Sequence, residues 1–239
     1  MKDFRADLVR MQLKLNRRQP FAFSRFGEGE LQILAGEPRN HPEYRFDPSD
    51  SGCVFLRERL LEAFRYRSES YYVGISCPHC VGQSRFDWAK QTCGQPEEQL
   101  TWATLLVNSN YAYFMEHVVP LFANYTVFLI CHTSAMLAKL PFPVVRAFRV
   151  EKNAWRTNFN LAHQLTELVA RERIKGALFV LCAGPFANIL AHKLHGRSNE
   201  NTYFDAGSTL DPLLFGDKGM TRRYLRRERR FVNQACTWN

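Results

Sequence analysis

Strand-like and helix-like patterns alternate along this chain of 239 residues, and this alternation limits its fold more than any other feature. Short apolar runs rich in β-branched or aromatic residues, bounded by glycine, proline or charged residues, are typical of buried strands. Such runs occupy residues 21–26, 71–76, 125–132, 144–150, 177–184 and 202–207. Amphipathic patterns typical of helices cover residues 4–15, 53–66, 158–172 and 185–196, with Gly196 as an expected C-cap. The alternation predicts one α/β, Rossmann-like domain over residues 1–217, with a mainly parallel sheet and helices on both faces.

A ligand is expected at the carboxyl ends of the predicted strands, because open parallel sheets bind ligands beyond that edge. The first such end reads "FAFSRFGEGEL" and places Glu28 and Glu30 directly after the strand. Two close carboxylates repel each other unless a cation or a helix N-terminus compensates them. In an extended or turn conformation, with Gly27 allowing a tight bend, both side chains would point the same way and address one Mg²⁺ or Mn²⁺ ion. The alternative is that they are ordinary first-turn acids of a helix.

Three further charged residues lie at or near predicted strand ends. Arg25, on the otherwise apolar first strand, suits a phosphate or a carboxylate, including a structural salt bridge to a nearby glutamate. Asp205 ends the sixth strand, where a carboxylate could bind a sugar hydroxyl or act as a base. Asp211 precedes a proline, and a turn-forming aspartate is the simpler interpretation there.

Two more loops contain groups suited to a phosphate or a nucleotide. Gly184 stands between the fifth strand and a helix that begins with proline, so exposed backbone N–H groups there would suit an anion, although a tight strand–helix turn explains it equally well. Lys152, Asn153 and Trp155 combine a cation, an amide and a ring that could stack on a base or sugar. A polar loop with one anchoring tryptophan is the alternative. The polar region 37–52 is expected to be a surface loop near the first strand end.

Polar amides interrupt the helical pattern of "LLVNSNYAYF", residues 105–114. Asn108 and Asn110 in this segment mark either a helix break or a hydrogen-bonding site. Neither a G-x-G-x-x-G fingerprint nor a P-loop motif occurs in the sequence. A nucleic-acid-binding motif is also missing, so we expect no nucleic-acid partner.

The cysteines leave several interpretations open. The chain has seven, and without an export signal they are expected to stay reduced in the cytoplasm. Cys77-Pro78-His79-Cys80 is a C-x-x-C pair, and Cys93 follows it. A structural zinc site usually takes four ligands from two paired motifs, and the sequence has no second pair. Zinc, a redox dithiol and ordinary buried thiols are therefore alternatives, of which the last is the simplest.

The formal net charge of +9 favours an anionic partner. Much of this charge lies in the C-terminal segment 218–239, where residues 218–231 contain seven basic residues and one acidic residue. Such a segment is either a solvated tail or a patch that contacts an anionic membrane. No apolar run is long enough to predict a transmembrane helix, so membrane contact would be peripheral, at the inner face.

Four segments, taken in chain order, resemble the glycosyltransferases of the GT-D fold, whose hallmark is an acidic D-x-E motif after the first strand. They are "SRFGEGE" (24–30), "LVNSNY" (106–111), "LCAGPFANILAHKLH" (181–195) and "NTYFDAGSTLDP" (201–212). The resemblance implies an enzyme that transfers a sugar from a nucleoside diphosphate donor, expected to be UDP-linked, to a glycan or glycoconjugate acceptor. It also implies Mn²⁺ or Mg²⁺ on the diphosphate.

The residues and the resemblance together assign a candidate site. Glu28 and Glu30 would bind the metal, and Asp205 and Glu28 would take part in catalysis. The expected substrate-binding residues are Arg25, Gly27, Asn108, Asn110, Tyr111, Lys152, Asn153, Trp155, Gly184 and Asp211. The first acid of the motif is glutamate where the family has aspartate, which makes Glu30 the firmer ligand. A metal-dependent nucleotide phosphohydrolase and a non-enzymatic protein that binds anions or membranes are the alternative functions.

Overall fold

The computed structural model describes residues 2–221, 225 and 235–238. These residues form a seven-stranded sheet in the order β5-β4-β1-β9-β8-β6-β7, in which every neighbouring pair of strands is parallel. The strands are β1 (Ala22–Phe26), β4 (Tyr71–Ile75), β5 (Leu100–Trp102), β6 (Val127–His132), β7 (Arg146–Val150), β8 (Leu178–Leu181) and β9 (Thr202–Asp205). The six predicted strands and the predicted α/β class are confirmed.

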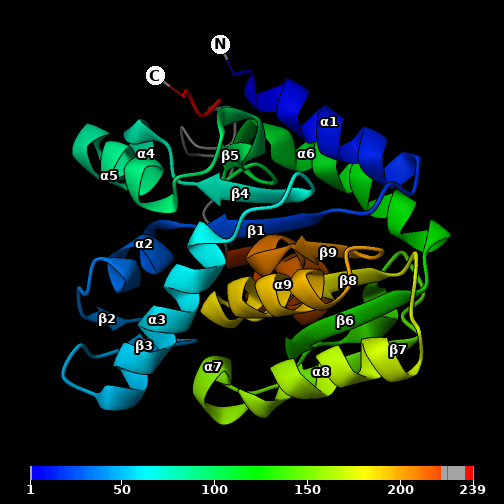
Figure 1. Ribbon diagram of the computed structural model, residues 1–239. Helices are drawn as coiled ribbons and strands as arrows, with labels where there is room; N and C mark the ends of the chain where they lie inside the picture. Colours follow the sequence, from blue (N-terminus) through cyan, green and yellow to red (C-terminus); the bar gives the residue numbers. More distant parts are fainter. Residues whose placement is uncertain (1, 222–224, 226–234, 239) are drawn as a thin grey trace.

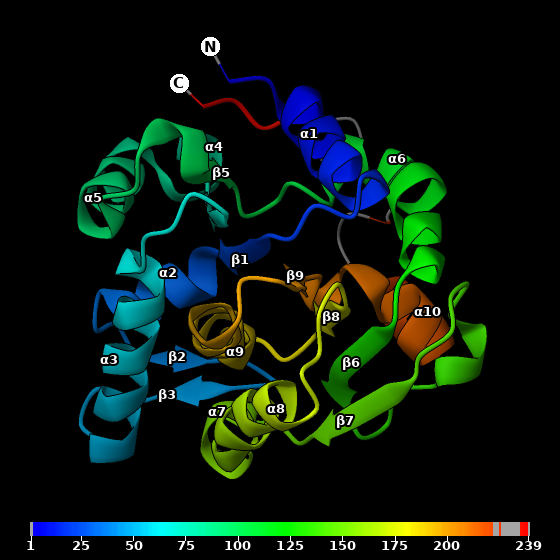
Figure 2. The same ribbon diagram turned by 45° about the vertical axis from the view of Figure 1, so that its right-hand side comes forward.

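Helices cover both faces of this sheet (Figure 1). The α-helices of the described residues are α1 (Phe4–Asn16), α2 (Glu28–Leu34), α3 (Ser51–Arg65), α4 (Pro78–Val81), α5 (Gln83–Cys93), α6 (Tyr111–Tyr113), α7 (Ala154–Thr157), α8 (Asn160–Arg171), α9 (Pro185–Arg197) and α10 (Asp211–Phe215). Helix α9 packs on β1 and β9 and has α3 and α8 as neighbours. Figure 2 shows α1 and α6 on the opposite side of the sheet. The four predicted helices correspond to α1, α3, α8 and α9.

The central strand β9 shows why the predicted strands read as nearly continuous apolar runs. Tyr203 faces α9, where its ring centroid lies 6.3 Å from that of His195. Phe204 faces the other way and packs on Phe114 and Phe122, at centroid distances of 6.3 and 5.6 Å. A parallel strand covered on both faces needs apolar side chains at every position, not at alternate ones.

The strand order reverses between β1 and β9. From β1 the chain continues outward to β4 and β5, and the other half of the sheet is built from β6 to β9 before β9 returns to pair with β1. The pairing between them runs through Ala22–Tyr203 and Phe23–Phe204. Open α/β sheets hold their ligands at such a switch point, beyond the carboxyl ends of the strands.

Several local expectations are wrong. Region 37–52 is not a simple surface loop, because it contains an antiparallel hairpin of β2 (Arg39–Asn40) and β3 (Arg45–Phe46) with buried aromatic side chains. Gly196 lies inside α9, whose C-cap is Ser198.

The membrane expectations concern the C-terminal segment. Its residues 222–224, 226–234 and 239 lie outside the described residues, so peripheral membrane contact stays a prediction. Among the residues that the structure describes, no helix has the length and apolar character needed to cross a membrane.

Candidate active site

A cleft of about 640 Å³ opens where the strand order reverses, beyond the carboxyl ends of β1 and β9. Its walls come from the turns after these strands, from hairpin β2–β3, and from α7 and the residues just before it. The predicted site residues that line it are Arg25, Gly27, Glu30, Lys152, Trp155, Gly184, Asp205 and Asp211. The fold therefore gathers groups from four loops that are far apart in the sequence.

The two glutamates of the E-x-E motif lie in the first turn of α2, with Gly27 as its N-cap. Side chains at i and i+2 of a helix do not face each other, so the expectation that both carboxylates point the same way is wrong. Glu30 lines the cleft, and its Oε2 accepts a hydrogen bond from the backbone N–H of Gly27 at 3.0 Å. Glu28 is exposed and does not line the cleft.

Two carboxyl groups of the cleft, those of Glu30 and Asp205, have raised pKa values. Burial raises the pKa of Glu30 to about 7, and the negative charge of Asp205 adds to the increase. Burial also raises the pKa of Asp205, while the positive charge of Arg25 opposes this change. A cation bound beside Glu30 would therefore relieve the cost of ionising it.

Arg25 and Asp205 are held together at the switch point. The backbone N–H of Arg25 donates to Oδ2 of Asp205 at 3.0 Å, and the Arg25 Nε lies 3.7 Å from Oδ1. Nη2 of Arg25 also donates to the carbonyl of Ala206 at 3.2 Å. Gly207 has a φ of +50°, and a Cβ there would collide with the guanidinium. These contacts fix the charged group of Arg25 over the turn that follows β9.

Tyr44, in the turn of the β2–β3 hairpin, is a cleft residue that the sequence reasoning missed. Its side chain is buried beside α2, where a Cβ on Gly29 would collide with the Tyr44 hydroxyl. On its other side a Cβ on Gly184 would lie 3.5 Å from the ring, and His41 stacks on it at a centroid distance of 4.7 Å. The glycine between the two glutamates was the signal for a close neighbour at this position.

Asn153 lies outside the cleft lining but holds the hairpin that carries Tyr44. It has a φ of +53° and precedes α7 as its N-cap. Its Oδ1 accepts a hydrogen bond from the N–H of Arg45 at 2.6 Å, and its own N–H donates to the carbonyl of Glu43 at 2.8 Å. The structure thus gives Asn153 a positioning contact, distinct from the direct substrate contact that we expected.

Lys152 and Trp155, which flank Asn153 in the sequence, both line the cleft. Lys152 is exposed at its rim, and Trp155 is buried in its wall. The indole Nε1 of Trp155 is buried and has no hydrogen-bond partner among the described residues. A buried donor without a partner is uncommon in native structures, where ordered water or a bound ligand can supply the acceptor.

Asn108, Asn110 and Tyr111 do not line the cleft. Asn110 is fully buried, and its Nδ2 donates to the carbonyls of Phe4 and Leu105, each at 2.9 Å. It therefore ties the start of α1 to the loop after β5. Asn108 has a φ of +56° in a 3₁₀ turn, so the interruption predicted in this segment is a helix break at Asn108 and a hydrogen-bonding site at Asn110.

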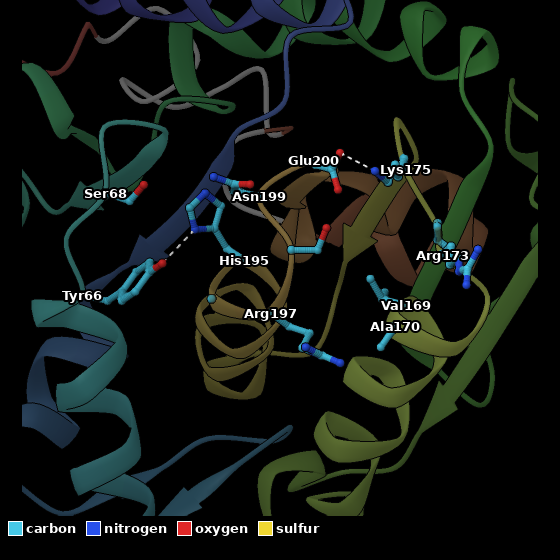
Figure 3. Close-up of a pocket in the computed structure, with 13 residues that line it drawn as sticks. Tyr66, Ser68, Val169, Ala170, Arg173, Lys175, His195, Arg197, Asn199 and Glu200 are labelled. Carbon is cyan, nitrogen blue, oxygen red and sulfur yellow. Dashed lines mark hydrogen bonds and ion pairs between the residues drawn. The ribbon is translucent and has the colours of Figure 1, made fainter.

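Figure 3 shows a second hollow, of about 530 Å³, at the opposite edge of the sheet. It lies beside the segments that precede β4, β8 and β9, which are the amino ends of these strands. Two pairs of its polar groups bind each other: Lys175 pairs with Glu200 at 2.8 Å, and the Tyr66 hydroxyl lies 3.2 Å from Nδ1 of His195. Open α/β sheets bind their ligands beyond the carboxyl ends of the strands, and this hollow lies at the amino ends. Its position and its paired polar groups therefore both favour the switch-point cleft as the candidate site.

The cleft fits a hard divalent cation that also binds a phosphate. Mg²⁺ and similar ions take oxygen ligands and commonly use one or two carboxylates together with substrate phosphates. Glu30 supplies a cleft carboxylate of this kind. Within the described part of the chain, no three carboxylates are close enough to hold an ion by themselves. A bound cation would therefore depend on oxygens from the substrate.

No known sequence family and no curated protein matches this chain. Among solved structures, it resembles a protein from Streptococcus sanguinis described as a new glycosyltransferase (DUF1792), with a TM-score of 0.60 and 17% identity over 85% of this chain and 81% of that one. Another DUF1792 structure, described as having a distinct glycosyltransferase fold, gives a TM-score of 0.57 and 16% identity over 84% and 76% of the two chains. The chain thus has an α/β fold of the glycosyltransferase type. The fold implied by the sequence resemblance is confirmed, and membership of a sequence family stays a prediction.

Proposed function

We propose that this protein is a glycosyltransferase that moves a sugar from a nucleoside diphosphate donor, UDP-linked in our expectation, to a glycan or glycoconjugate acceptor. One observation carries the proposal. Acidic and basic side chains, Glu30 and Asp205 with Arg25 and Lys152, meet in one cleft at the switch point of a glycosyltransferase-type fold. Such a cleft suits an anionic donor and a divalent cation.

Glu30 would hold the cation, which we expect to be Mn²⁺ or Mg²⁺. When bound, the ion would neutralise negative charge on the leaving diphosphate. The guanidinium of Arg25 is held by its ion pair with Asp205 and by the carbonyls of Ala103 and Ala206, and it would bind diphosphate oxygens in a defined geometry. Lys152, exposed at the rim, would add a second positive charge.

Asp205 is the proposed base that removes the acceptor proton. The residue is 4% exposed, and its carboxyl group is held in place by the backbone N–H of Arg25. Burial raises its pKa, which moves it toward the range that a base needs at neutral pH. The buried indole N–H of Trp155 would donate to the donor nucleotide or its sugar.

A thermal-shift panel of nucleoside diphosphates and nucleotide sugars, with and without Mn²⁺, tests donor binding. We expect one nucleoside diphosphate to raise the melting temperature when Mn²⁺ is present and to have little effect without it. Glu30→Gln should abolish the Mn²⁺-dependent rise and lower sugar transfer by roughly 10- to 100-fold. Glu28→Gln is the matched control, because Glu28 lies two residues earlier in the same helical turn and outside the cleft. It should keep both the Mn²⁺-dependent rise in melting temperature and the rate of sugar transfer.

Three outcomes would contradict parts of this proposal. Full metal-dependent turnover in Glu30→Gln would show that Glu30 is not the metal ligand. Loss of turnover in Glu28→Gln would assign that role to the exposed Glu28. Hydrolysis of nucleotide sugars that no acceptor increases would favour a metal-dependent nucleotide phosphohydrolase.

A further inference from the structure

Three cysteine thiols gather outside the cleft. The Sγ atoms of Cys77, Cys80 and Cys236 all lie within 4.8 Å of one another, and those of Cys77 and Cys80 are 3.5 Å apart. Zinc–thiolate bonds of about 2.3 Å in a tetrahedral site place the sulfur atoms about 3.8 Å apart. The 3.5 Å between Cys77 and Cys80 is close to this value, and the third sulfur lies within 4.8 Å of both, near enough for all three to reach one ion.

The C-x-x-C pair has the backbone geometry to present two thiols together. Cys77 is the N-cap of the short helix α4, and the N–H of Cys80 donates to its carbonyl at 2.9 Å. Cys77 is fully buried and Cys80 is half-buried. The two sulfur atoms thus lie on one side of a tight turn, with one face of the pair accessible to the third thiol.

Cys236 is held by polar groups, unlike an inert buried thiol. The hydroxyl of Thr104 lies 3.1 Å from its sulfur, and Nδ2 of Asn108 donates to the same atom at 3.6 Å. Donors directed at a metal-bound sulfur are a regular part of metal sites, where they orient the ligand and stabilise its charge. Asn108, one of the two partners, has a left-handed backbone with a φ of +56°.

The chain end next to Cys236 is also anchored. Trp238 packs edge-on against Phe86 and Trp102, and its Nε1 donates to Oε1 of Glu97 at 2.6 Å. Lys2 lies over its ring at 5.1 Å. Cys236 is therefore positioned by its neighbours in the chain as well as by contacts of its own.

We propose that Cys77, Cys80 and Cys236 bind a zinc ion that fastens residues 235–238 to α4 and to the loop after β5. Within the described residues no fourth cysteine, histidine or carboxylate joins these three thiols. Thr104 also lines the cleft, so the zinc site would support one wall of it. The proposal does not rest on the proposed function.

Metal content of the full chain, produced with zinc in the growth medium, tests this proposal. We expect roughly one zinc ion per chain in the purified protein. Cys236→Ser and Cys77→Ser should each lose it, whereas Cys93→Ser should retain it, because Cys93 is a buried thiol of the same region outside the cluster. Exchange of the zinc for Co²⁺ should give a thiolate-to-cobalt charge-transfer band and tetrahedral d–d bands.

Several results would overturn the proposal. They are a protein without zinc after expression in zinc-containing medium, a Cys77–Cys80 disulfide in the protein as purified from that medium under reducing conditions, and full zinc content in Cys236→Ser. If a serine variant fails to fold, the cobalt spectrum of the unsubstituted protein still tests the proposal. Absence of the thiolate-to-cobalt band would then contradict it. Mn²⁺-dependent nucleotide binding, measured on the same samples, reports separately on the cleft.

Discussion

Gly29 determines how closely the β2–β3 hairpin approaches α2. Because it has no side chain, the hydroxyl of Tyr44 can lie against the first turn of the helix, next to Glu30. Tyr44 is buried and stacked on His41, so it has little room to move away from a larger residue. One missing methyl group thus shapes the cleft beside the proposed metal ligand.

We expect Gly29→Ala to displace Tyr44 and to weaken nucleoside diphosphate binding, measured by calorimetry in the presence of Mn²⁺. Gly196→Ala is the matched control, because it is also a helical glycine but a Cβ there would have ordinary contacts. The control should raise the free energy of unfolding by about 0.5–1 kcal/mol, as alanine does in helices. If adding Tyr44→Phe to Gly29→Ala restores no binding, the collision with the hydroxyl is not the cause.

Single residues were predicted well where their chemistry and their place along a strand agreed. Arg25 and Asp205 reached the cleft because strand ends in a parallel sheet share one edge. Glu28 did not, because a helix that starts at this residue turns neighbouring side chains apart. Asn110 was interpreted from its polarity alone, and its buried hydrogen bonds to α1 depend on tertiary contacts that the local sequence does not contain.

At the scale of elements, His195 links the last turn of α9 by hydrogen bonds to the segment between α3 and β4. Its Nε2 lies 2.9 Å from the hydroxyl of Ser70, and its Nδ1 faces Tyr66 at the end of α3. Burial lowers the pKa of His195 to about 4, and the neighbouring His192 adds to this effect. The imidazole therefore stays neutral in the folded protein at pH values where the unfolded chain takes up a proton.

This shift predicts how stability depends on pH. Above the ordinary histidine pKa of about 6.5 the contribution is constant, and it falls as the pH drops from there toward 4. From His195 alone the loss at pH 5 is about 2 kcal/mol. Glu30 acts in the opposite direction, because its raised pKa costs stability as the pH rises toward 7.

Urea unfolding at pH 7 and pH 5 separates these contributions when variants are compared. His195→Gln should reduce the difference between the two free energies of unfolding by about 2 kcal/mol. His163→Gln, at an exposed position on α8, is the control for replacing a histidine. An unchanged difference in His195→Gln would show that this residue does not carry the pH dependence.

Helices and strands with a regular apolar pattern could be predicted from the sequence, and strands of two or three residues could not. The six predicted strands are four to six residues long and mostly apolar. Strand β5 has three residues, and each strand of the hairpin has two, which is too short for a period to be recognised. Gly196 looked like a helix end because glycine commonly follows one, yet α9 continues through it.

At the scale of the whole molecule, the net charge of +9 acts on any anionic donor. A positive field speeds the approach of anions, and salt screens it. If the donor is a nucleoside diphosphate, its association rate constant should fall roughly tenfold between low and high ionic strength. Stopped-flow binding checks this, and an equal rate constant at both ionic strengths would show that the charge does not steer the donor.

The class of fold could be predicted because alternating strands and helices leave few arrangements. The sequence could not predict which strands pair with each other or which distant segments come into contact. Nothing local to Cys236 indicates that it meets Cys77, 159 positions earlier in the numbering, and nothing near Tyr44 shows that it closes over α2. Such pairings are properties of the folded chain as a whole.

The pairing of β1 with β9 also sets an order of events during synthesis. Strand β1 leaves the ribosome early, but its partner on one side is made almost at the end of the described chain. Until then that edge of β1 is unpaired and open to the wrong neighbours. The cleft lies at this same junction, so the side chains that line it come together when the nascent chain makes one of its last long-range contacts.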